Sequence, residues 1–464
     1  MQRLSGLDAA FLALETPTAH MHVLGVAVLD PSTAPGSFGY DEVRARLESR
    51  MHLIPPMRRR IVEVPFGLNA PVRIEDPDFD LDFHLRRAAL PAPGGEAELA
   101  DFVADVAGRP LNRSHPLWEA WVIEGLEHGY FAFVAKLHHS LIDGASGVEI
   151  LSALFDLEPD PQPTETDIEP EWEPERVPND MELLAFGAVS LMQRPGKLIK
   201  AANNLGRGVV RAVQRARENE LDVTLPLTAP RLTMNRALTP HRKVAFSSVP
   251  LADVKAAKNA LGVTINDIVL AVTAGALRSY LAQRGELPDQ PLVAAIPTSV
   301  RAADDREMGN RVSTMFASLP VDIENPARRV DAVRRSTVGA KQTHESVGST
   351  TLEQWAEVAA PILFSGVIRL HTRLRFGERV RPAINMIVSN VPGPSFPLYL
   401  AGARLVALHP LGPLLADAGL NLTVMSYMDH VDFGFIACRE LVPDVAALAA
   451  LVPDALAEIV KTAG

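Results

Sequence analysis

The 464-residue sequence contains one cysteine, Cys438, and its aromatic residues make up only 6% of the chain. A single cysteine excludes disulfides within the chain and any zinc or redox site that is built on a Cys-x-x-Cys pair. Basic residues are also scarce, since 45 Lys and Arg stand against 56 Asp and Glu, a net charge of −11. This balance argues against a general nucleic-acid binder, because neutralising phosphates requires a basic face.

Long apolar runs are missing as well. No stretch of about 18 apolar residues is free of charge, proline and glycine clusters, so a membrane-spanning helix is not expected. The first fifteen residues carry Asp8 and Glu15 within their apolar stretch and have no signal-cleavage pattern. With 47% apolar and 22% charged residues, the sequence predicts a soluble, intracellular protein of two or three globular domains.

The charge and proline content change sharply along the chain and divide it into segments. Residues 156–182 hold eleven acidic residues, six prolines and one base, Arg176, which is typical of an extended linker. Residues 183–217 then hold seven bases and no acid, with apolar residues at helical spacing, so one or two amphipathic helices are expected there. The predicted organisation is an N-terminal half (1–157), an acidic Pro-rich linker (158–182), a basic amphipathic connector (183–225) and a C-terminal half (226–464).

Strand and helix patterns alternate irregularly on both sides of the linker. Alternating or continuous apolar runs predict strands at 21–29, 117–123, 130–137, 243–249, 292–296, 313–319, 383–389, 403–408, 420–427 and 431–436. Helical periodicity and capping residues predict helices beginning near Ser5 and spanning 40–51, 96–107, 251–261 and 264–283. The fold class is therefore α/β, with two similar mixed-sheet domains.

The residues most informative about chemistry follow the strand predicted at 130–137. They form an HHxxxDG motif with His138, His139, Asp143 and Gly144. If the strand persists to His139, the two histidines point to opposite faces, so one can face a cavity while the other packs. An imidazole can accept a proton from an alcohol near neutral pH. The alternative is a pair of structural histidines, which is the commoner situation for two arbitrary neighbours.

Other chemistries find less support in the sequence. Adjacent histidines on opposite faces cannot both bind one metal ion, and no HExxH or CxxC pattern accompanies them. Gly144-Ala-Ser-Gly147 only approaches the G-x-S-x-G elbow of hydrolases, since the fifth position is Val148. Gly206-Arg-Gly208 lacks the remaining glycine of a dinucleotide loop, and no Walker pattern is present.

Several motifs together resemble those of one family. The HHxxxDG motif in a chain of two α/β halves resembles the coenzyme-A-dependent acyltransferase superfamily. Further stretches resemble the bacterial wax ester synthase/diacylglycerol acyltransferase family of the mycobacterial triacylglycerol synthase type: residues 4–12 with 21–23, Pro116-Leu-Trp118, Asn266-Asp-Ile-Val-Leu-Ala271, Pro297-Thr-Ser-Val-Arg301, Ser389-Asn-Val-Pro-Gly-Pro394 and residues 420–427.

The resemblance implies roles for individual residues. His139 would be the general base in a channel between the two halves, with His138 in support. Asp143 would brace the turn through an arginine, for which Arg301 is one candidate, and Gly144 would permit the turn. Asn266 and Asp267 would contact substrate, and the equally weighted alternative is that they satisfy the first amides of a helix.

The resemblance also implies an activity, a co-substrate and a location. It implies an acyl-coenzyme A:diacylglycerol O-acyltransferase that makes triacylglycerol from long-chain acyl-CoA, with no bound metal or cofactor and no nucleic-acid partner. A fatty alcohol (wax ester synthesis) or another complex lipid could be the acceptor instead, and a catalytically silent lipid-droplet protein is the non-enzymatic alternative. We expect a cytoplasmic protein attached peripherally to the inner membrane or to lipid droplets through residues 183–217, unless those bases pair with the acidic linker.

Overall fold

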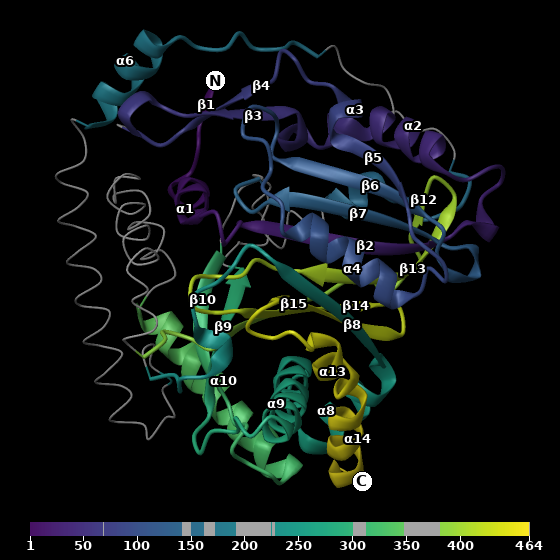
Figure 1. The fold of residues 1–464 in the computed structure, drawn as a ribbon, viewed down its shortest axis with the longest axis vertical. Coiled ribbons are helices and arrows are strands. Elements are labelled where there is room, and N and C mark those ends of the chain that lie inside the picture. The colour runs from purple at the N-terminus through teal and green to yellow at the C-terminus, as the bar shows by residue number, and fades with distance from the viewer. Residues whose placement is uncertain are drawn as a thin grey trace.

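The computed structural model describes residues 1–67, 69–141, 150–161, 172–191, 224, 228–299, 312–347 and 381–463. It consists of two large mixed β-sheets, one in each half of the molecule, with helices between and around them (Figure 1). The predicted class, α/β with two mixed-sheet domains, is confirmed. The bounds of the four segments that were expected from composition stay predictions.

The first sheet has the strand order β12-β13-β2-β7-β6-β5. All neighbours are antiparallel except β5 and β6. Its strands are β2 (His22–Asp30), β5 (Leu85–Ala89), β6 (Trp118–Glu124), β7 (Phe131–His138), β12 (Tyr399–Leu400) and β13 (Ala403–Leu411). The helices α2 (Tyr40–Arg50) and α3 (Leu81–His84) lie on one side, where Val43, Leu47 and Leu81 belong to the same core as Phe133 and Leu137 of β7.

The second sheet has the order β10-β9-β11-β14-β15-β8, with β9, β11 and β14 parallel and the other neighbours antiparallel. Its strands are β8 (Arg242–Pro250), β9 (Leu292–Ser299), β10 (Val312–Leu319), β11 (Met386–Val391), β14 (Leu420–Tyr427) and β15 (His430–Cys438). Among the described residues, the helices that cover its lower side in Figure 1 are α8 (Leu251–Leu261), α9 (Ile265–Gln283), α10 (Pro326–Val347), α13 (Val445–Ala450) and α14 (Val452–Ala463).

Strand β13 joins the two halves: with β12 it lies in the sequence between β11 and β14 of the second sheet, and yet it pairs with β2 of the first. It also packs across the second sheet. A Cβ added at Gly434 of β15 would lie 2.0 Å from the carbonyl oxygen of Pro410, so only glycine allows this approach. The carboxylate of Asp432 holds the crossing, because it accepts hydrogen bonds from the Leu408 amide (3.2 Å) and from the Ser248 hydroxyl.

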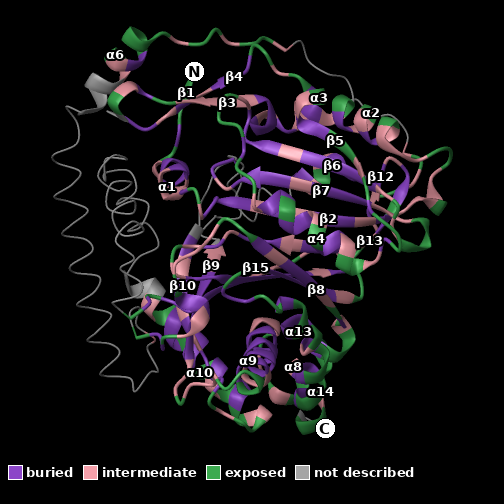
Figure 2. Ribbon diagram, viewed as in Figure 1, coloured by how far each residue is buried: buried purple, intermediate pink, exposed green. Residues whose placement is uncertain are grey.

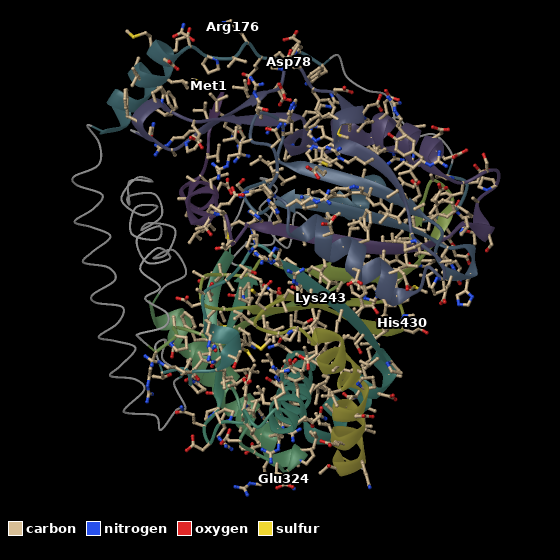
Figure 3. The ribbon with its side chains drawn as sticks, viewed as in Figure 1. Met1, Asp78, Arg176, Lys243, Glu324 and His430 are labelled. Atoms are coloured by element: carbon tan, nitrogen blue, oxygen red, sulfur yellow. The ribbon has the colours of Figure 1, made fainter. Side chains whose placement is uncertain are left out.

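Helix α4 (Glu96–Ala107) lies between the two sheets and gives them a common core. Val103 and Ala104 of α4 belong to the same cluster of buried residues as Val134 of β7 and Phe246 of β8. Figure 2 shows buried positions on α4 and on the strands of both sheets. At the rim of the contact, Lys243 of β8 forms an ion pair with Asp101 of α4 at 2.7 Å (Lys243 is labelled in Figure 3).

A small third sheet, order β1-β4-β3, covers the outer side of the first half. It consists of β1 (Gln2–Arg3), β3 (Arg59–Val62) and β4 (Val72–Glu75). The end of the acidic segment docks here, because the Glu175 amide donates to the Glu75 carbonyl (3.1 Å) and Trp172 packs edge-on against Phe79. Helix α6 (Asp180–Leu191) follows, and its Leu183 is buried against the small sheet. Most of the basic segment, residues 192–217, lies outside the described residues.

Within the described residues, no single helix has the length and apolar composition to cross a membrane. Helices α8 and α9 reach the required composition only as a pair, and that pair is bent by 104°.

Candidate active site

The histidine pair lies at the end of β7, in the first sheet. The strand ends at His138, one residue earlier than the alternation argument assumed, and His139 is the first residue of the following turn. The His139 amide donates to the carbonyl of Met21 beside it (2.7 Å), which ties the turn to the start of β2. The two side chains still differ in exposure as expected: His138 is 1% exposed, whereas His139 is half-buried.

The hydrogen bonds of His138 indicate which of its ring nitrogens carries the proton. Its Nδ1 accepts from the Ser140 amide at 3.0 Å and lies 2.7 Å from the Ser140 hydroxyl. The proton of the neutral ring is therefore on Nε2, which lies 3.7 Å from Oε2 of Glu15. Burial lowers the pKa of His138 to about 3, although the charge of Glu15 opposes this shift. His138 is thus a neutral imidazole near pH 7.

Glu15 is the centre of a histidine cluster that the sequence reasoning did not anticipate. Three imidazoles lie around its carboxylate: Nδ1 of His20 at 3.6 Å, Nε2 of His22 at 4.0 Å and Nε2 of His138 at 3.7 Å. Arg113 donates to the same carboxylate and to the Leu12 carbonyl (3.2 Å). Burial raises the pKa of Glu15, but the interactions with His20, His138 and Arg113 outweigh it and bring the pKa to about 2.

These interactions give the cluster one fixed negative charge beside the histidine pair. Burial, and then the charge of Lys136, lower the pKa of His22 well below its ordinary value. Two features of the sequence could have indicated this cluster. His20 and His22 are two residues apart at the start of β2, and Glu15 directly follows the last residue of helix α1. Neither was assigned any chemistry from the sequence, because the contact between them depends on how the helix and the strand fold together.

Helix α1 (Gly6–Leu14) places an aromatic ring over the second histidine. The rings of Phe11 and His139 are stacked, with centroids 4.1 Å apart and an angle of 16° between their planes. Ser5 caps the helix by accepting from the Asp8 amide (3.1 Å), as the sequence predicted. One ring of the pair is therefore held against a carboxylate, and the other against a phenyl group.

Lys136, two residues before His138 in β7, anchors this strand to α4. Its ammonium group is buried and donates to the carbonyls of Val106 (3.1 Å) and Arg109 (3.0 Å) at the C-terminal end of that helix. A positive charge at this end of a helix is favourable, because the unpaired carbonyls carry partial negative charge. Burial lowers the pKa of Lys136 to about 8.

The predicted substrate residues Asn266 and Asp267 lie in the first turn of α9. Asp267 is 4% exposed and forms a capping box with Thr264: its Oδ2 accepts from the Thr264 amide (2.9 Å), and the Thr264 hydroxyl oxygen accepts from the Asp267 amide (3.2 Å). Its Oδ1 also accepts from the Thr337 hydroxyl (2.7 Å). These contacts favour the helix-capping alternative for Asp267. Asn266 is only half-buried, and its Oδ1 accepts a long hydrogen bond (3.4 Å) from Asn390, which belongs to the Ser-Asn-Val-Pro-Gly-Pro stretch.

Other residues of the sequence-based site have different outcomes. Asp143, Gly144 and Arg301 lie outside the described residues, so their predicted roles stay predictions. Trp118 of the PLW motif is completely buried, donates to the Met57 carbonyl (2.7 Å) and stacks on His84 at 4.4 Å. This motif therefore packs the core of the first half.

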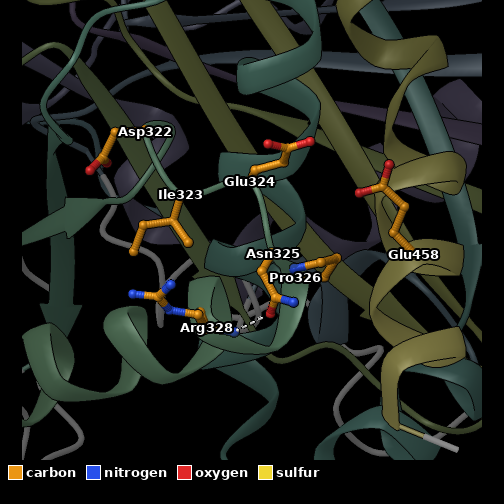
Figure 4. A pocket seen from close by; sticks show the side chains of 7 residues that line it. All are labelled: Asp322, Ile323, Glu324, Asn325, Pro326, Arg328 and Glu458. Atoms are coloured by element: carbon orange, nitrogen blue, oxygen red, sulfur yellow. Dashed lines mark hydrogen bonds between the residues drawn. The ribbon is translucent and has the colours of Figure 1, made fainter.

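His139 does not line either of two hollows that the described residues form. One lies where α10 begins and is lined by Asp322, Ile323, Glu324, Asn325, Pro326, Arg328 and Glu458 (Figure 4). The other lies between the halves, lined by Thr16, Thr18, Ala19, Ala237, Leu238, Ala416 and Asp417. Within the described part of the chain, no group of three or more His, Cys, Asp or Glu has the arrangement to hold a metal ion.

Comparison with known proteins agrees with this fold and shows the family of the chain. The catalytic domain of the wax ester synthase/diacylglycerol acyltransferase family matches residues 4–269, and its C-terminal domain matches residues 308–460. A Mycobacterium tuberculosis H37Rv protein, provisionally named a diacylglycerol O-acyltransferase, is 38% identical over 99% of this chain and 90% of its own length. A second from the same strain is 35% identical over 100% of this chain and 97% of its own.

Solved structures extend the comparison. A wax ester synthase/diacylglycerol acyltransferase from Marinobacter aquaeolei is 29% identical and has a TM-score of 0.71, with both chains covered completely. A trichothecene 15-O-acetyltransferase from Fusarium sporotrichioides is 10% identical with a TM-score of 0.60, covering 98% of this chain and 94% of that chain. The second similarity concerns the fold alone.

Proposed function

Because the chain belongs to the wax ester synthase/diacylglycerol acyltransferase family, we propose that this acyltransferase moves a long-chain acyl group from acyl-coenzyme A to the free hydroxyl of a diacylglycerol. The product is triacylglycerol. The observation that carries the proposal is the position of His139: it is half-buried at the end of β7, beside a neutral, fully packed His138. One imidazole of the pair is thus packed in the core, whereas the other is partly exposed.

His139 acts as the general base in this proposal. It accepts the proton of the acceptor hydroxyl while the hydroxyl oxygen attacks the carbonyl carbon of the thioester. The carbon–sulfur bond then breaks, and the coenzyme A thiolate takes the proton back from the imidazolium. No covalent acyl-enzyme is formed in this proposal: the hydroxyl of Ser140 lies 2.7 Å from Nδ1 of His138, but Ser140 is only 3% exposed and is therefore not accessible to an acyl thioester as a nucleophile. No metal or bound cofactor takes part in the proposed steps.

The neighbouring residues support this step. His138 accepts from the Ser140 amide and so fixes the turn that carries His139. Asp143 braces the same turn through an arginine, and Asn266 contacts a substrate oxygen. The substrates meet in a channel between the two halves, with acyl-CoA entering from one side and the acceptor from the other.

A second acceptor is supported by the relative from Marinobacter, whose name includes wax ester synthase. Transfer to a long-chain alcohol would use the same base and the same thioester, so both reactions fit the site. We rank the diacylglycerol reaction first because the mycobacterial relatives, at 35–38% identity over nearly the whole chain, carry names for that reaction.

We also propose that the protein works peripherally on the inner membrane or on lipid droplets, since its acceptor is a lipid. Residues 183–217 contain seven bases and no acid, and each base near an anionic leaflet contributes about 1 kcal/mol. Replacement of Arg207, Arg211 and Arg215 by glutamine should release the protein from anionic vesicles in a flotation assay. Unchanged flotation of this variant would place the lipid contact elsewhere.

The decisive experiment gives the purified protein labelled palmitoyl-CoA and, separately, a diacylglycerol, a monoacylglycerol or hexadecanol. Labelled triacylglycerol as the main product supports the proposal, whereas a main product of wax ester assigns the second acceptor. Initial-rate plots should intersect, as expected for a ternary complex. Lipid binding without any transfer would contradict the enzymatic function and indicate a silent lipid-binding protein.

A further inference from the structure

Helix α1 is held at both ends by ion pairs with arginines from other parts of the chain. Near its start, Asp8 is 1% exposed and accepts from the guanidinium of Arg73 at 2.8 Å. At its end, Arg113 donates to the Leu12 carbonyl and to Glu15, the residue that follows the last helical turn. Two arginines from other elements thus fix a helix of only nine residues. Displacing such a helix would leave buried charges without partners, which is costly.

Two different residues at this helix lie against the two histidines of the pair. Phe11 and Glu15 are four positions apart, the spacing that brings side chains to the same helix face. Phe11 stacks on His139 at 4.1 Å, and Glu15 lies 3.7 Å from Nε2 of His138. Leu12, the neighbour of Phe11, is 8% exposed and packs into the core of the first half, whereas Phe11 remains half-buried.

A phenyl ring in this position has two physical effects on the imidazole. Parallel contact over the whole ring face restricts rotation about the terminal torsion of the histidine, which is otherwise broad. The electron-rich face of the phenyl ring also attracts a positive charge above it. An imidazole that has just accepted a proton is such a charge.

We propose that Phe11 is a positioning residue for the transfer reaction: its ring fixes the orientation of the His139 imidazole and stabilises the imidazolium that forms when the acceptor hydroxyl gives up its proton. The inference rests on the proposed function for the role of the imidazolium. The stacking itself rests only on the geometry of α1 and β7. Phe11 contacts the base rather than the reacting atoms.

Three substitutions of Phe11 distinguish the effect of its aromatic ring from the effect of its side-chain volume. Phe11→Ala removes both, Phe11→Leu keeps an apolar side chain without a π face, and Phe11→Tyr restores the ring. We expect Ala and Leu to lower kcat about 10- to 100-fold, the loss typical of a misplaced catalytic group, with KM for acyl-CoA changed less than about twofold. Tyr should keep more than about half of the wild-type kcat. Thermal midpoints, measured in parallel, show whether each variant is folded.

Phe131→Leu is the matched control. Phe131 lies at the other end of the same strand, β7, is half-buried and forms an edge-on pair with Phe38 at 5.0 Å. Its substitution should shift the thermal midpoint about as much as Phe11→Leu and leave kcat unchanged. If both leucine variants lower kcat equally, the effect of Phe11 is structural and the proposal is wrong.

Proton NMR of the histidine rings gives a readout that requires no substrate. The His139 ring signals, identified by their loss in His139→Gln, should be shifted upfield by the stacked phenyl ring in wild type and return toward ordinary values in Phe11→Leu. The His139 titration midpoint should fall in the same variant, because the imidazolium loses its partner. Among the described residues, the titratable and charged groups around the pair are Glu15, His20, His22, Arg113 and His138, and they are the same in both proteins.

The outcomes separate this inference from the proposed function. Wild-type kcat in Phe11→Leu, or His139 signals without an upfield shift, would overturn the positioning role while the enzyme remains active. A wild-type protein with shifted His139 signals but no transfer to any acceptor would overturn the proposed function, and the catalytic role of Phe11 with it.

Discussion

In each half of the molecule one central strand ends in the same kind of turn, but the side chains of the two turns differ in chemistry. In the first sheet β7 ends at His138, and the Leu141 amide closes the turn onto the His138 carbonyl (2.9 Å). In the second sheet β15 ends at Cys438, and the Leu441 amide closes onto the Cys438 carbonyl (3.0 Å). The partner strands also begin alike, after single bridges between Thr16 and Ala19 and between Leu415 and Ala418.

Different side chains occupy these two turns. The first carries the histidine pair, with Glu15 enclosed by imidazoles and Arg113. In the second, Arg439 and Glu440 follow the strand, and Glu440 accepts from Thr239 and interacts with His241 at 2.7 Å. Glu440 is 37% exposed on its side chain, against 11% for Glu15. The backbone forms a similar turn at the end of a strand in both halves, but only the turn in the first half carries a candidate base.

Removing that base should give the largest effect. His139→Ala should lower the transfer rate by about 10²–10⁴-fold, because no neighbouring group replaces the proton acceptor. The corresponding change in the second half, Arg439→Ala, should leave the rate unaltered. Both are measured with labelled acyl-CoA at saturating acceptor, with thermal midpoints to confirm folding. Near wild-type turnover in His139→Ala would contradict the proposed mechanism.

The two glutamates should differ in stability. The pKa of Glu15 falls from 4.5 to about 2 on folding, so its stabilising effect is present above pH 4.5 and is lost as the pH falls toward 2. Glu15→Gln should lower the free energy of unfolding at pH 7 by about 1–3 kcal/mol, measured by urea denaturation. This difference from wild type should shrink below pH 4.5.

Glu440→Gln is the counterpart in the second half. The pKa of Glu440 is also lowered to about 2, by its hydrogen bonds with Thr239 and His241 against the effect of burial. Solvent screens this more exposed carboxylate, so the cost should be less than about 1 kcal/mol. Equal losses for the two variants would show that enclosure by imidazoles adds nothing to the stability provided by Glu15.

His138 should make stability depend on pH. Its pKa falls from 6.5 to about 3, so between these values the unfolded chain binds a proton that the folded protein does not. Stability therefore decreases as the pH falls from 6.5 toward 3, by up to about 1.4 kcal/mol per pH unit for this group. In His138→Gln, the free energy of unfolding should depend on pH less steeply, by the contribution of one proton, as measured by urea denaturation between pH 6.5 and 4.5. Cys438→Ser, in the equivalent position, should leave the slope unchanged.

The smallest effect is expected at the rim between the halves. Lys243 is 36% and Asp101 is 69% exposed in their ion pair. Lys243→Gln should lower the free energy of unfolding by about 0.2–1 kcal/mol. The difference should vanish in 1 M salt, because exposed charges are screened there. A larger, salt-resistant loss would mean that this pair, rather than the common core around α4, holds the halves together.

Much of the local structure could be read from the sequence. Helix α4 has its predicted bounds, and α9 begins where Thr264 was expected to cap it. Helix α8 ends at Gly262, which adopts φ 64. The reason is that apolar periodicity, caps and a left-handed glycine are properties of neighbouring residues. In contrast, α10 was not anticipated, because its 22 residues are mostly polar and few of them, such as Val330 and Val333, join the core.

The candidate site also has features that could be predicted from the sequence and features that could not. The sequence by itself determined the histidine pair, the strand before it and the family to which the chain belongs, since these depend on motifs of consecutive residues. Only the tertiary structure decided that β13 pairs with the first sheet, that Glu15 lies among three imidazoles and that Phe11 covers His139. A local pattern states that a residue is buried or faces one side. It does not state which distant element it meets, because that contact is set by the packing of the whole chain.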